Sequence, residues 1–304
     1  MNINGYIDLQ VNGYLGTDFS GENLTEEKCA AACEKLLANN TAAFLATVVT
    51  SSEDIYERNL GIIANIISRP QFKGRVLGIH AEGPFISDKP GAVGAHNPAW
   101  TKKPDKAFFD KMQNWAKGNI RILTIAAENP GAEDLCKYAV KNGTTISLGH
   151  QDADLEQLKR LSQAGAELLT HVGNAMPNMV HRHNNALLAA LAVKELTAMI
   201  ITDGHHLPAH VIEAIINAKG TDKIIITSDA SPIAGMPPGK YNVLDNIAVL
   251  EENGLLHNPQ KQCLVGSSAT ISECIAFIRS LNILTEQQIK QVSNINPLKV
   301  LKIS

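Results

Sequence analysis

Five side chains that can bind a metal ion or move a proton follow short apolar segments of this sequence. They are Glu82, His150, His171, His206 and Asp229. Each lies at or just past the end of a run of apolar residues that is typical of a buried strand. Two imidazoles and one carboxylate that meet at one place leave a fourth coordination position open, as in catalytic zinc sites. The pattern predicts a metal centre, provided that the fold brings the ends of these runs together.

Each of these residues alone also has a purely structural explanation, because an acidic residue at a strand end commonly caps the following helix. Their joint placement favours Glu82, His150 and His171 as the ligands of one divalent metal ion, with zinc as the metal. Asp229 is then the carboxylate left to take a proton from water and pass it to a leaving group. The residues alone leave open whether an amide, an ester or a phosphoester is cleaved.

Apolar runs alternate with amphipathic segments along nearly the whole chain. The runs predict eight strands, at 6–11, 43–49, 75–81, 121–126, 144–148, 167–170, 197–201 and 223–228. The segments between them predict helices that include 25–38, 54–67, 132–141, 154–163 and 208–218. This alternation predicts a (β/α)8 TIM-type barrel in a single domain over residues 1–304, whose active site lies at the carboxyl ends of the strands. A doubly wound sheet is disfavoured because no GxGxxG motif follows the first run.

Two long irregular stretches, 83–104 and 231–262, follow the third and eighth predicted strands. Loops of this length in a compact domain are usually functional or inserted. The second stretch contains an apolar alternation through Val243, Ile247 and Val249. We expect a small hairpin here that packs these three side chains against an apolar surface of the barrel.

The composition argues against several classes of partner. The chain has 304 residues, 44% of them hydrophobic, and a formal net charge of -3, so no basic surplus points to nucleic acid or to an anionic membrane. No apolar run approaches the roughly 18 residues of a membrane span. The first residues lack the pattern of a signal peptide, and the five cysteines are scattered. We therefore expect a cytoplasmic protein.

Eight short segments occur in an order that resembles the N-acetylglucosamine-6-phosphate deacetylase family of the amidohydrolase superfamily. They are GYIDLQVNG at 5–13, HAEGPF at 80–85, GAHNP at 94–98, LGH at 148–150, THVGNAMP at 170–177, DGHH at 203–206, TSDA at 227–230 and LVGS at 264–267. The resemblance implies removal of the N-acetyl group from N-acetylglucosamine 6-phosphate or a close relative. Under it, Glu82, His150 and His171 hold the metal, and Asp229 is the general base and acid. His96 polarises the acetamide carbonyl.

The resemblance also implies how the sugar phosphate is held. The family grips the phosphate with the backbone at Asn174 and Ala175, an arginine matching Arg182 and a histidine matching His206. Because that arginine comes from the other subunit, we expect a homodimer. Further substrate contacts are expected from residues in the matching segments, namely Gln10, Asn12, Ala95, Leu264 and Gly266.

The start of the matching region predicts a single metal ion. Many members of the superfamily begin with His-x-His and hold two ions, whereas this chain has Gln10 and Asn12 at those positions. Neutral amides are poor ligands for a transition metal, so one ion is also the physical expectation.

Three departures from the family keep other functions open. Family members usually carry a small β-sandwich before the first barrel strand, and we expect it to be absent here. Gly173 stands where a large residue is usual, and 178–183 is unusually polar. An amidohydrolase acting on another N-acyl or cyclic amide substrate is the main alternative. A non-catalytic sugar-phosphate-binding barrel is the other, but it predicts the loss of a metal or base residue, and none is lost.

Overall fold

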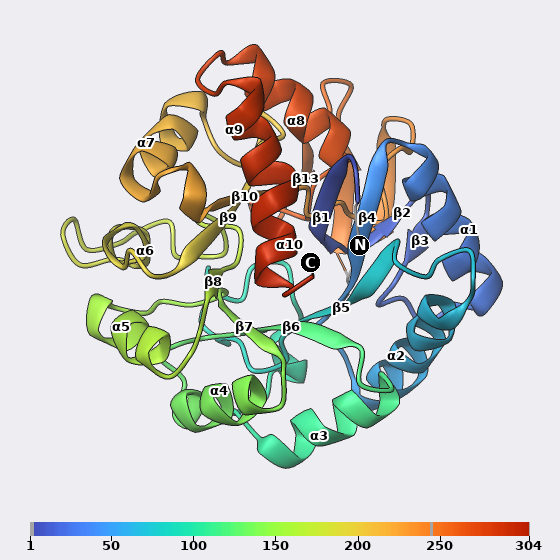
Figure 1. The fold of residues 1–304 in the computed structure, drawn as a ribbon, viewed down its shortest axis with the longest axis horizontal. Coiled ribbons are helices and arrows are strands. Elements are labelled where there is room, and N and C mark those ends of the chain that lie inside the picture. The colour runs from blue at the N-terminus through green and yellow to red at the C-terminus, as the bar shows by residue number, and fades with distance from the viewer. Residues whose placement is uncertain (1–2, 244–245, 304) are drawn as a thin grey trace.

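The computed structural model describes residues 3–243 and 246–303. Eight parallel strands follow one another around a sheet in chain order, and helices surround them (Figure 1). The strands are β1 (Tyr6–Val11), β4 (Thr41–Val49), β5 (Val76–Glu82), β6 (Ile120–Ile125), β7 (Thr145–Leu148), β8 (Leu168–Leu169), β9 (Thr197–Ile201) and β10 (Ile224–Thr227). The predicted (β/α)8 TIM-type barrel is confirmed, and all eight predicted runs contain or overlap a strand.

One main helix follows each barrel strand before the next begins. These helices are α1 (Glu26–Ala38), α2 (Glu53–Ser68), α3 (Lys106–Trp115), α4 (Ala132–Lys141), α5 (Leu155–Gln163), α6 (Ala186–Ala192), α7 (Ala209–Lys219) and α8 (Ile271–Ser280). Short 3-10 turns cover Pro98–Trp100 and Thr221–Lys223. Capping side chains fix where helices begin. At α1 the Thr25 side chain accepts a hydrogen bond from the Lys28 backbone N–H, and at α5 Asp154 forms a capping box with Gln157.

The barrel closes between β1 and β10 through a buried side chain. The Asp8 carboxylate on β1 accepts hydrogen bonds from the Thr227 hydroxyl at 2.6 Å and from the Ser228 backbone N–H at 3.1 Å. The Ser228 hydroxyl also donates to it. Just past the carboxyl ends of β1 and β10 the two backbones bond directly, because the Asn12 N–H donates to the carbonyl of Ala230 at 2.8 Å. The contact between β1 and β10, which we call the seam of the barrel, therefore depends on the Asp8 carboxylate, and the apolar pattern of β1 does not reveal this role.

The amino-terminal end of the barrel is plugged by the end of the chain. There α9 (Glu286–Lys290), the π-helical segment Gln291–Ile295 and α10 (Asn296–Val300) form one continuous run. Figure 1 shows α10 lying across the centre of the barrel. Val300 and Leu301 pack with Ile7, Leu9 and Leu45 in the cluster that fills this end of the interior. The carboxyl ends of the strands are the other end, where TIM barrels place their active sites.

A four-stranded antiparallel sheet follows β10. It consists of β11 (Gly239–Val243), β12 (Asn246–Leu250), β13 (Leu256–Asn258) and β14 (Cys263–Leu264). The expected hairpin is thus part of a larger sheet, whose last strand lies just past residue 262. A smaller pair, β2 (Gly13–Tyr14) and β3 (Thr17–Asp18), follows β1.

The expected packing of the alternating residues on this sheet is wrong in part. Val243 is buried, but Ile247 is 46% exposed and Val249 is half-buried. The register is the reason: Val243 pairs with Asn246, so Ile247 lies opposite Asn242 and points to the other face. The inward side chains are those of Val243, Ala248, Leu250 and Leu256, which pack with Ile233 and Val265.

Among the described residues, every helix is too short or too polar to cross a lipid bilayer.

Candidate functional site

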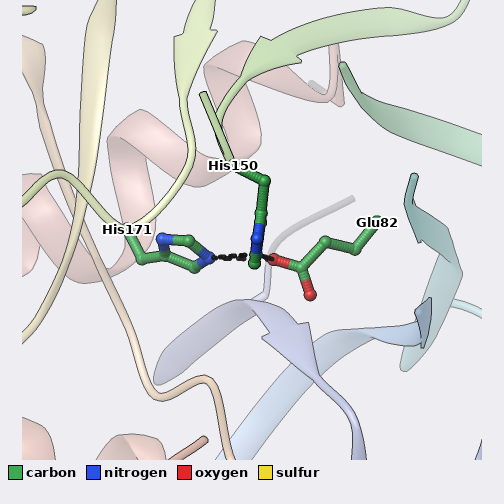
Figure 2. A group of neighbouring side chains, drawn as sticks. All are labelled: Glu82, His150 and His171. Atoms are coloured by element: carbon green, nitrogen blue, oxygen red, sulfur yellow. Dashed lines mark hydrogen bonds and ion pairs between the residues drawn. The ribbon is translucent and has the colours of Figure 1, made fainter. Parts of the chain in front are cut away.

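Glu82, His150 and His171 converge at the carboxyl ends of β5, β7 and β8, where all three side chains are buried (Figure 2). Glu82 Oε1 lies 3.1 Å from His150 Nε2 and 2.9 Å from His171 Nε2. The two Nε2 atoms lie 3.1 Å apart. The sequence named these three residues as ligands, and the structure brings them together.

The donor set fits a divalent metal ion. Two neutral imidazoles that aim lone pairs at each other and at a carboxylate oxygen repel one another unless a cation or a proton lies between them. The ligand atoms of a tetrahedral zinc ion with bonds of about 2.0–2.1 Å lie roughly 3.3 Å apart. The separations of 2.9–3.1 Å here are close to that spacing. One oxygen and two nitrogen donors are also a common catalytic zinc set.

Three site residues share an unusual backbone conformation at the same distance from a strand. His150, His171 and Asp229 each stand two residues past the end of β7, β8 or β10. Their φ angles are 50°, 27° and 51°, in the left-handed region that side chains other than glycine rarely adopt. Strained backbone of this kind is concentrated at functional sites. The side chains that these turns carry meet at the mouth of the barrel, where His150 and His171 contact Glu82 and Asp229 contacts Gln10.

The irregular stretch 83–104 orients one of the histidines. His150 Nδ1 lies 3.0 Å from the carbonyl oxygen of Ala92, and a carbonyl can only accept. The hydrogen therefore sits on Nδ1, and the neutral ring presents the lone pair of Nε2 to Glu82 and His171. We call Glu82, His150 and His171 together the ligand group. A side chain at Gly94 would lie 3.2 Å from His150 Cε1, so this close approach favours glycine, which also has φ +59°.

Burial and neighbouring charges have opposing effects on the pKa values of Glu82 and His171. Burial favours the neutral carboxyl of Glu82, but the side chains of His150, His171 and His96 that surround it hold its pKa well below its usual range. Burial and the neighbouring His96 lower the pKa of His150 to about 4. Burial also opposes the charged form of His171, yet the hydrogen bond and negative charge of Glu82 raise its pKa. The carboxylate is therefore ionised and ready to bind a cation.

Asp229 lies beside the ligand group without belonging to it. Its Oδ1 accepts hydrogen bonds from Asn12 Nδ2 at 2.7 Å and from Gln10 Nε2 at 2.9 Å. Gln10 Nε2 also donates to Glu82 Oε1 at 2.8 Å. Burial and the negative charge of Glu82 raise the pKa of Asp229 to about 6. A carboxyl with this proton affinity can both accept and return a proton near neutral pH.

His96, on the stretch 83–104, lies against the same group. Its Nε2 is 3.7 Å from Glu82 Oε2, and its ring centroid is 4.3 Å from that of His150. Its Nδ1 lies 3.0 Å from the hydroxyl of Thr50, which also donates to the carbonyl oxygen of Glu82 at 3.2 Å. A side chain at Gly83 would come within 2.2 Å of that hydroxyl, so the glycine leaves room for it.

Three other expected substrate contacts follow β8 and β9. Asn174 is held close to His171, because its backbone and side-chain N–H groups both donate to the carbonyl of that residue, at 3.0 and 3.2 Å. Ala175 has φ 49°. His206 Nδ1 lies 2.7 Å from Asp203 Oδ2.

Arg182 lies exposed in the segment 178–184, three residues after Met179, which is 92% exposed. This position keeps Arg182 out of the buried ligand group of its own chain.

The remaining predicted contacts lie where the antiparallel sheet joins the barrel. Gly266 approaches the backbone of Asp229, since an added side chain would lie 3.1 Å from its carbonyl oxygen. Leu264 is half-buried at the end of β14, and Ala95 packs against the core of the antiparallel sheet.

Some residues that shape the site were missed by sequence reasoning. Thr50 contacts His96, Asp203 contacts His206, and Ala92 contacts His150. Asp203 had a recognisable signal, because it stands three residues before a histidine just past a strand. Thr50 and the carbonyl of Ala92 had none, since both act through contacts that only the folded chain creates.

The comparisons with known proteins agree with this geometry. No family model matches the sequence. It is 28% identical over 300 residues to the N-acetylglucosamine-6-phosphate deacetylase of Lysinibacillus sphaericus, covering 99% of this chain and 76% of that protein. It is 32% identical over 250 residues to the protein of the same name from Caenorhabditis elegans, covering 79% of this chain and 59% of that one.

A solved structure extends the comparison to the fold. The crystal structure of N-acetyl-D-glucosamine-6-phosphate deacetylase from Mycobacterium smegmatis superimposes with a TM-score of 0.89 at 25% identity, covering 98% of this chain and 78% of that one. Sequence similarity along nearly the whole chain, the shared barrel and the buried Glu82, His150 and His171 group lead to one conclusion. The chain belongs to the N-acetylglucosamine-6-phosphate deacetylase family.

Proposed function

We propose that this protein is a metal-dependent hydrolase that removes the acetyl group from N-acetylglucosamine 6-phosphate, giving acetate and the amino sugar phosphate. One observation carries the proposal: the buried donors of Glu82, His150 and His171 meet beside the separate carboxyl of Asp229. Relatives that cover 98% or 99% of this chain have the name of this activity.

Glu82, His150 and His171 would hold one divalent ion, and we assign zinc. When bound, such an ion polarises a carbonyl group and makes water more acidic. The limit to one ion is supported by Gln10, whose amide nitrogen lies between Glu82 Oε1 and Asp229 Oδ1 at 2.8 and 2.9 Å. A neutral amide group there supplies hydrogen bonds to both carboxylates but is a poor ligand for a second transition metal ion.

Asp229 moves the proton in this mechanism. It takes a proton from the attacking water and delivers it to the amide nitrogen as the carbon–nitrogen bond breaks. Gln10 and Asn12 both donate to Oδ1, so we assign the proton transfer to Oδ2. The same two donors hold the carboxyl group in place through both proton transfers.

His96 would contact the oxygen of the acetamide carbonyl. Its ring is buried beside the ligand group, 3.7 Å from Glu82 Oε2 through Nε2. With both ring nitrogens protonated, a hydrogen bond from Nε2 to the carbonyl oxygen stabilises the negative charge that develops there when water adds. The Thr50 hydroxyl donates its hydrogen to the carbonyl of Glu82 and accepts from Nδ1 of His96, so Nε2 is the nitrogen left for this role.

The sugar phosphate would lie over the turns that follow β8, β9 and β14. The backbone at Asn174 and Ala175 and the ring of His206 border this region, with Arg182 as the guanidinium that binds the phosphate in two places. The other contacts would come from Gln10, Asn12, Ala95, Leu264 and Gly266.

We propose that Arg182 acts in the site of a neighbouring subunit, so that the enzyme is a homodimer. Two observations support this: Arg182 is exposed, and the adjacent Met179 and Val180 are 92% and 40% exposed. Apolar side chains beside an exposed arginine are typical of a surface that another protein covers.

We further place the reaction in the cytoplasm. All five cysteines are free, and four of them are buried, as expected for a chain that keeps its thiols in a reducing compartment.

Acetate release from a panel of N-acyl sugar phosphates, with metal analysis of the same sample, tests the function. N-acetylglucosamine 6-phosphate is expected to have the highest kcat/KM, and chelation is expected to abolish turnover until zinc is restored. Activity on other N-acyl or cyclic amides alone would favour a different amidohydrolase. Binding of sugar phosphates without turnover by the metal-loaded protein would favour a non-catalytic role.

A further inference from the structure

The turn after β9 holds a histidine and a carboxylate in close contact, and neither residue belongs to the group of Glu82, His150 and His171. Asp203 Oδ2 lies 2.7 Å from His206 Nδ1, and the two side chains are 3% and 5% exposed. Asp203 Oδ1 accepts the backbone N–H groups of His205 and His206, each at 2.9 Å. A side chain at Gly204 would lie 2.8 Å from the ring of Phe277, so the turn can be this compact only with glycine there.

The proton on the histidine can be assigned from this geometry. Burial alone would raise the pKa of Asp203, but hydrogen bonds from the His206 side chain and from the backbone N–H groups of His205 and His206 hold it well below its usual range. An ionised carboxylate only accepts hydrogen bonds. His206 therefore carries a hydrogen on Nδ1, and Nε2 is the ring nitrogen that Asp203 leaves available.

Ser267 connects this pair to the proposed proton carrier. The Ser267 hydroxyl donates to Asp203 Oδ2 at 2.9 Å, and the Ser267 backbone N–H donates to the carbonyl of Asp229, also at 2.9 Å. Ser267 follows β14, so one residue joins the antiparallel sheet, the end of β10 and the turn after β9. The position of His206 is thus fixed relative to Asp229.

We propose that Asp203 is a positioning residue that fixes His206 with its hydrogen on Nδ1 and supports a positive charge on the ring when an anion binds at Nε2. The anion is a phosphate monoester, and this part of the inference rests on the proposed function. A cationic ring backed by a carboxylate gives a charge-assisted hydrogen bond to phosphate, which is about twice as strong as a neutral one. Asp203 itself does not touch the substrate.

The first test is nuclear magnetic resonance of the protein labelled with 15N in its histidines. The His206 signals are assigned by their loss in His206→Gln, and the two ring nitrogens have different shifts in the two tautomers. The free protein is expected to show hydrogen on Nδ1, and added inorganic phosphate is expected to produce the doubly protonated ring. Hydrogen on Nε2 of the neutral ring, or no response to phosphate, would overturn the inference. This measurement needs no variant of Asp203.

The second test is Asp203→Asn, with Asp222→Asn as the matched control. Asparagine can still accept the two backbone N–H groups, but its NH2 group would face Nδ1 and move the hydrogen to Nε2. Asp222 is exposed in the turn before β10, at the opposite end of the barrel, and its substitution makes the same change of charge.

For Asp203→Asn we expect phosphate binding to weaken about tenfold. We expect KM for the phosphorylated sugar to rise by the same factor and kcat to change less than KM. A non-phosphorylated analogue and the Asp222→Asn protein should behave like the original. Phosphate binding that is unchanged in Asp203→Asn would overturn the inference. If the protein binds phosphate as described but hydrolyses none of the panel, the proposed function fails while the role of Asp203 stands.

Discussion

Gln10 donates a hydrogen bond from its amide nitrogen to Glu82 Oε1 at 2.8 Å, and the same nitrogen donates to Asp229 at 2.9 Å. The orientation of the amide is fixed, since a flipped group would set its oxygen against two carboxylates. Gln10 therefore lies between Glu82, the proposed metal ligand, and Asp229, the carboxyl that is proposed to move the proton.

The first prediction concerns metal content. We expect one equivalent of a divalent ion per chain, because only Glu82, His150 and His171 combine suitable donors at the required spacing within the described residues. His171→Ala is expected to weaken binding by more than the roughly 10–100-fold typical of a lost contact outside the ligands. Elemental analysis of the purified protein and of the zinc-treated variant checks both statements. Two tightly bound equivalents in the original protein would contradict them.

The second prediction concerns Asp229→Asn. The asparagine oxygen can still accept from Gln10 and Asn12, so the fold and the metal content should be retained. Turnover should fall by at least about 10²-fold, as is typical when a general acid–base group is lost. Steady-state kinetics and metal analysis on one preparation measure both effects. Near-normal turnover would assign the proton transfer to another group.

The third prediction concerns Thr50 and His96. Thr50→Val removes the hydroxyl that lies 3.0 Å from His96 Nδ1, so the ring loses the contact that orients it. We expect kcat to fall about tenfold with little change in KM, because one hydrogen bond contributes roughly 0.5–1.5 kcal/mol. Thr50→Ser retains the hydroxyl and should recover most of the activity.

A matched control for Thr50 lies at the start of β4, the strand that Thr50 directly follows. Thr41 is buried at the other end of β4, and its hydroxyl has no hydrogen-bond partner within the described part of the chain. Thr41→Val should therefore leave kcat unchanged. Equal losses in Thr41→Val and Thr50→Val would show a general effect of the substitution on the strand.

The fourth prediction concerns Arg182. Arg182→Ala should raise KM for the phosphorylated sugar about 10–100-fold, the effect of a lost charge-assisted contact of roughly 1.5–3 kcal/mol, and should leave a non-phosphorylated analogue unaffected. Arg182→Lys should recover only part, because lysine cannot bind one phosphate with two parallel hydrogen bonds. An unchanged preference for the phosphorylated sugar would remove Arg182 from the site.

Mixed dimers separate the two possible sources of this arginine. When Arg182→Ala and Asp229→Asn chains exchange subunits in equal amounts, half of the dimers are hybrids, and each contains one intact site. At a substrate concentration well below the raised KM of Arg182→Ala, about a quarter of the original activity should then return. If Arg182 serves the site of its own chain, mixing should restore none.

The fifth prediction concerns the seam of the barrel. Asp8→Ala leaves the buried donors of Thr227 and Ser228 without their acceptor, so the free energy of unfolding should fall by roughly 3 kcal/mol. Urea denaturation of the metal-loaded protein measures this change. Asp222→Ala, at an exposed position, should stay within about 0.5 kcal/mol of the original.

Patterns along the chain were enough to predict the order of the barrel strands and to point to Glu82, His150 and His171 as candidate metal ligands. A parallel strand buried on both faces must be a short apolar run, so each strand could be recognised without its neighbours. Glu82, His150 and His171 could be named because strand ends of a barrel meet at one mouth. These inferences need only local patterns and one topological rule.

The contacts that surround these residues could be seen only in the folded chain. The closure of β1 on β10 through Asp8 and the contact of Thr50 with His96 both join segments far apart in the chain. The face to which Ile247 points likewise depends on the pairing register of two strands. Hydrogen-bond partners and register arise from packing between distant segments, and no pattern within one segment encodes them.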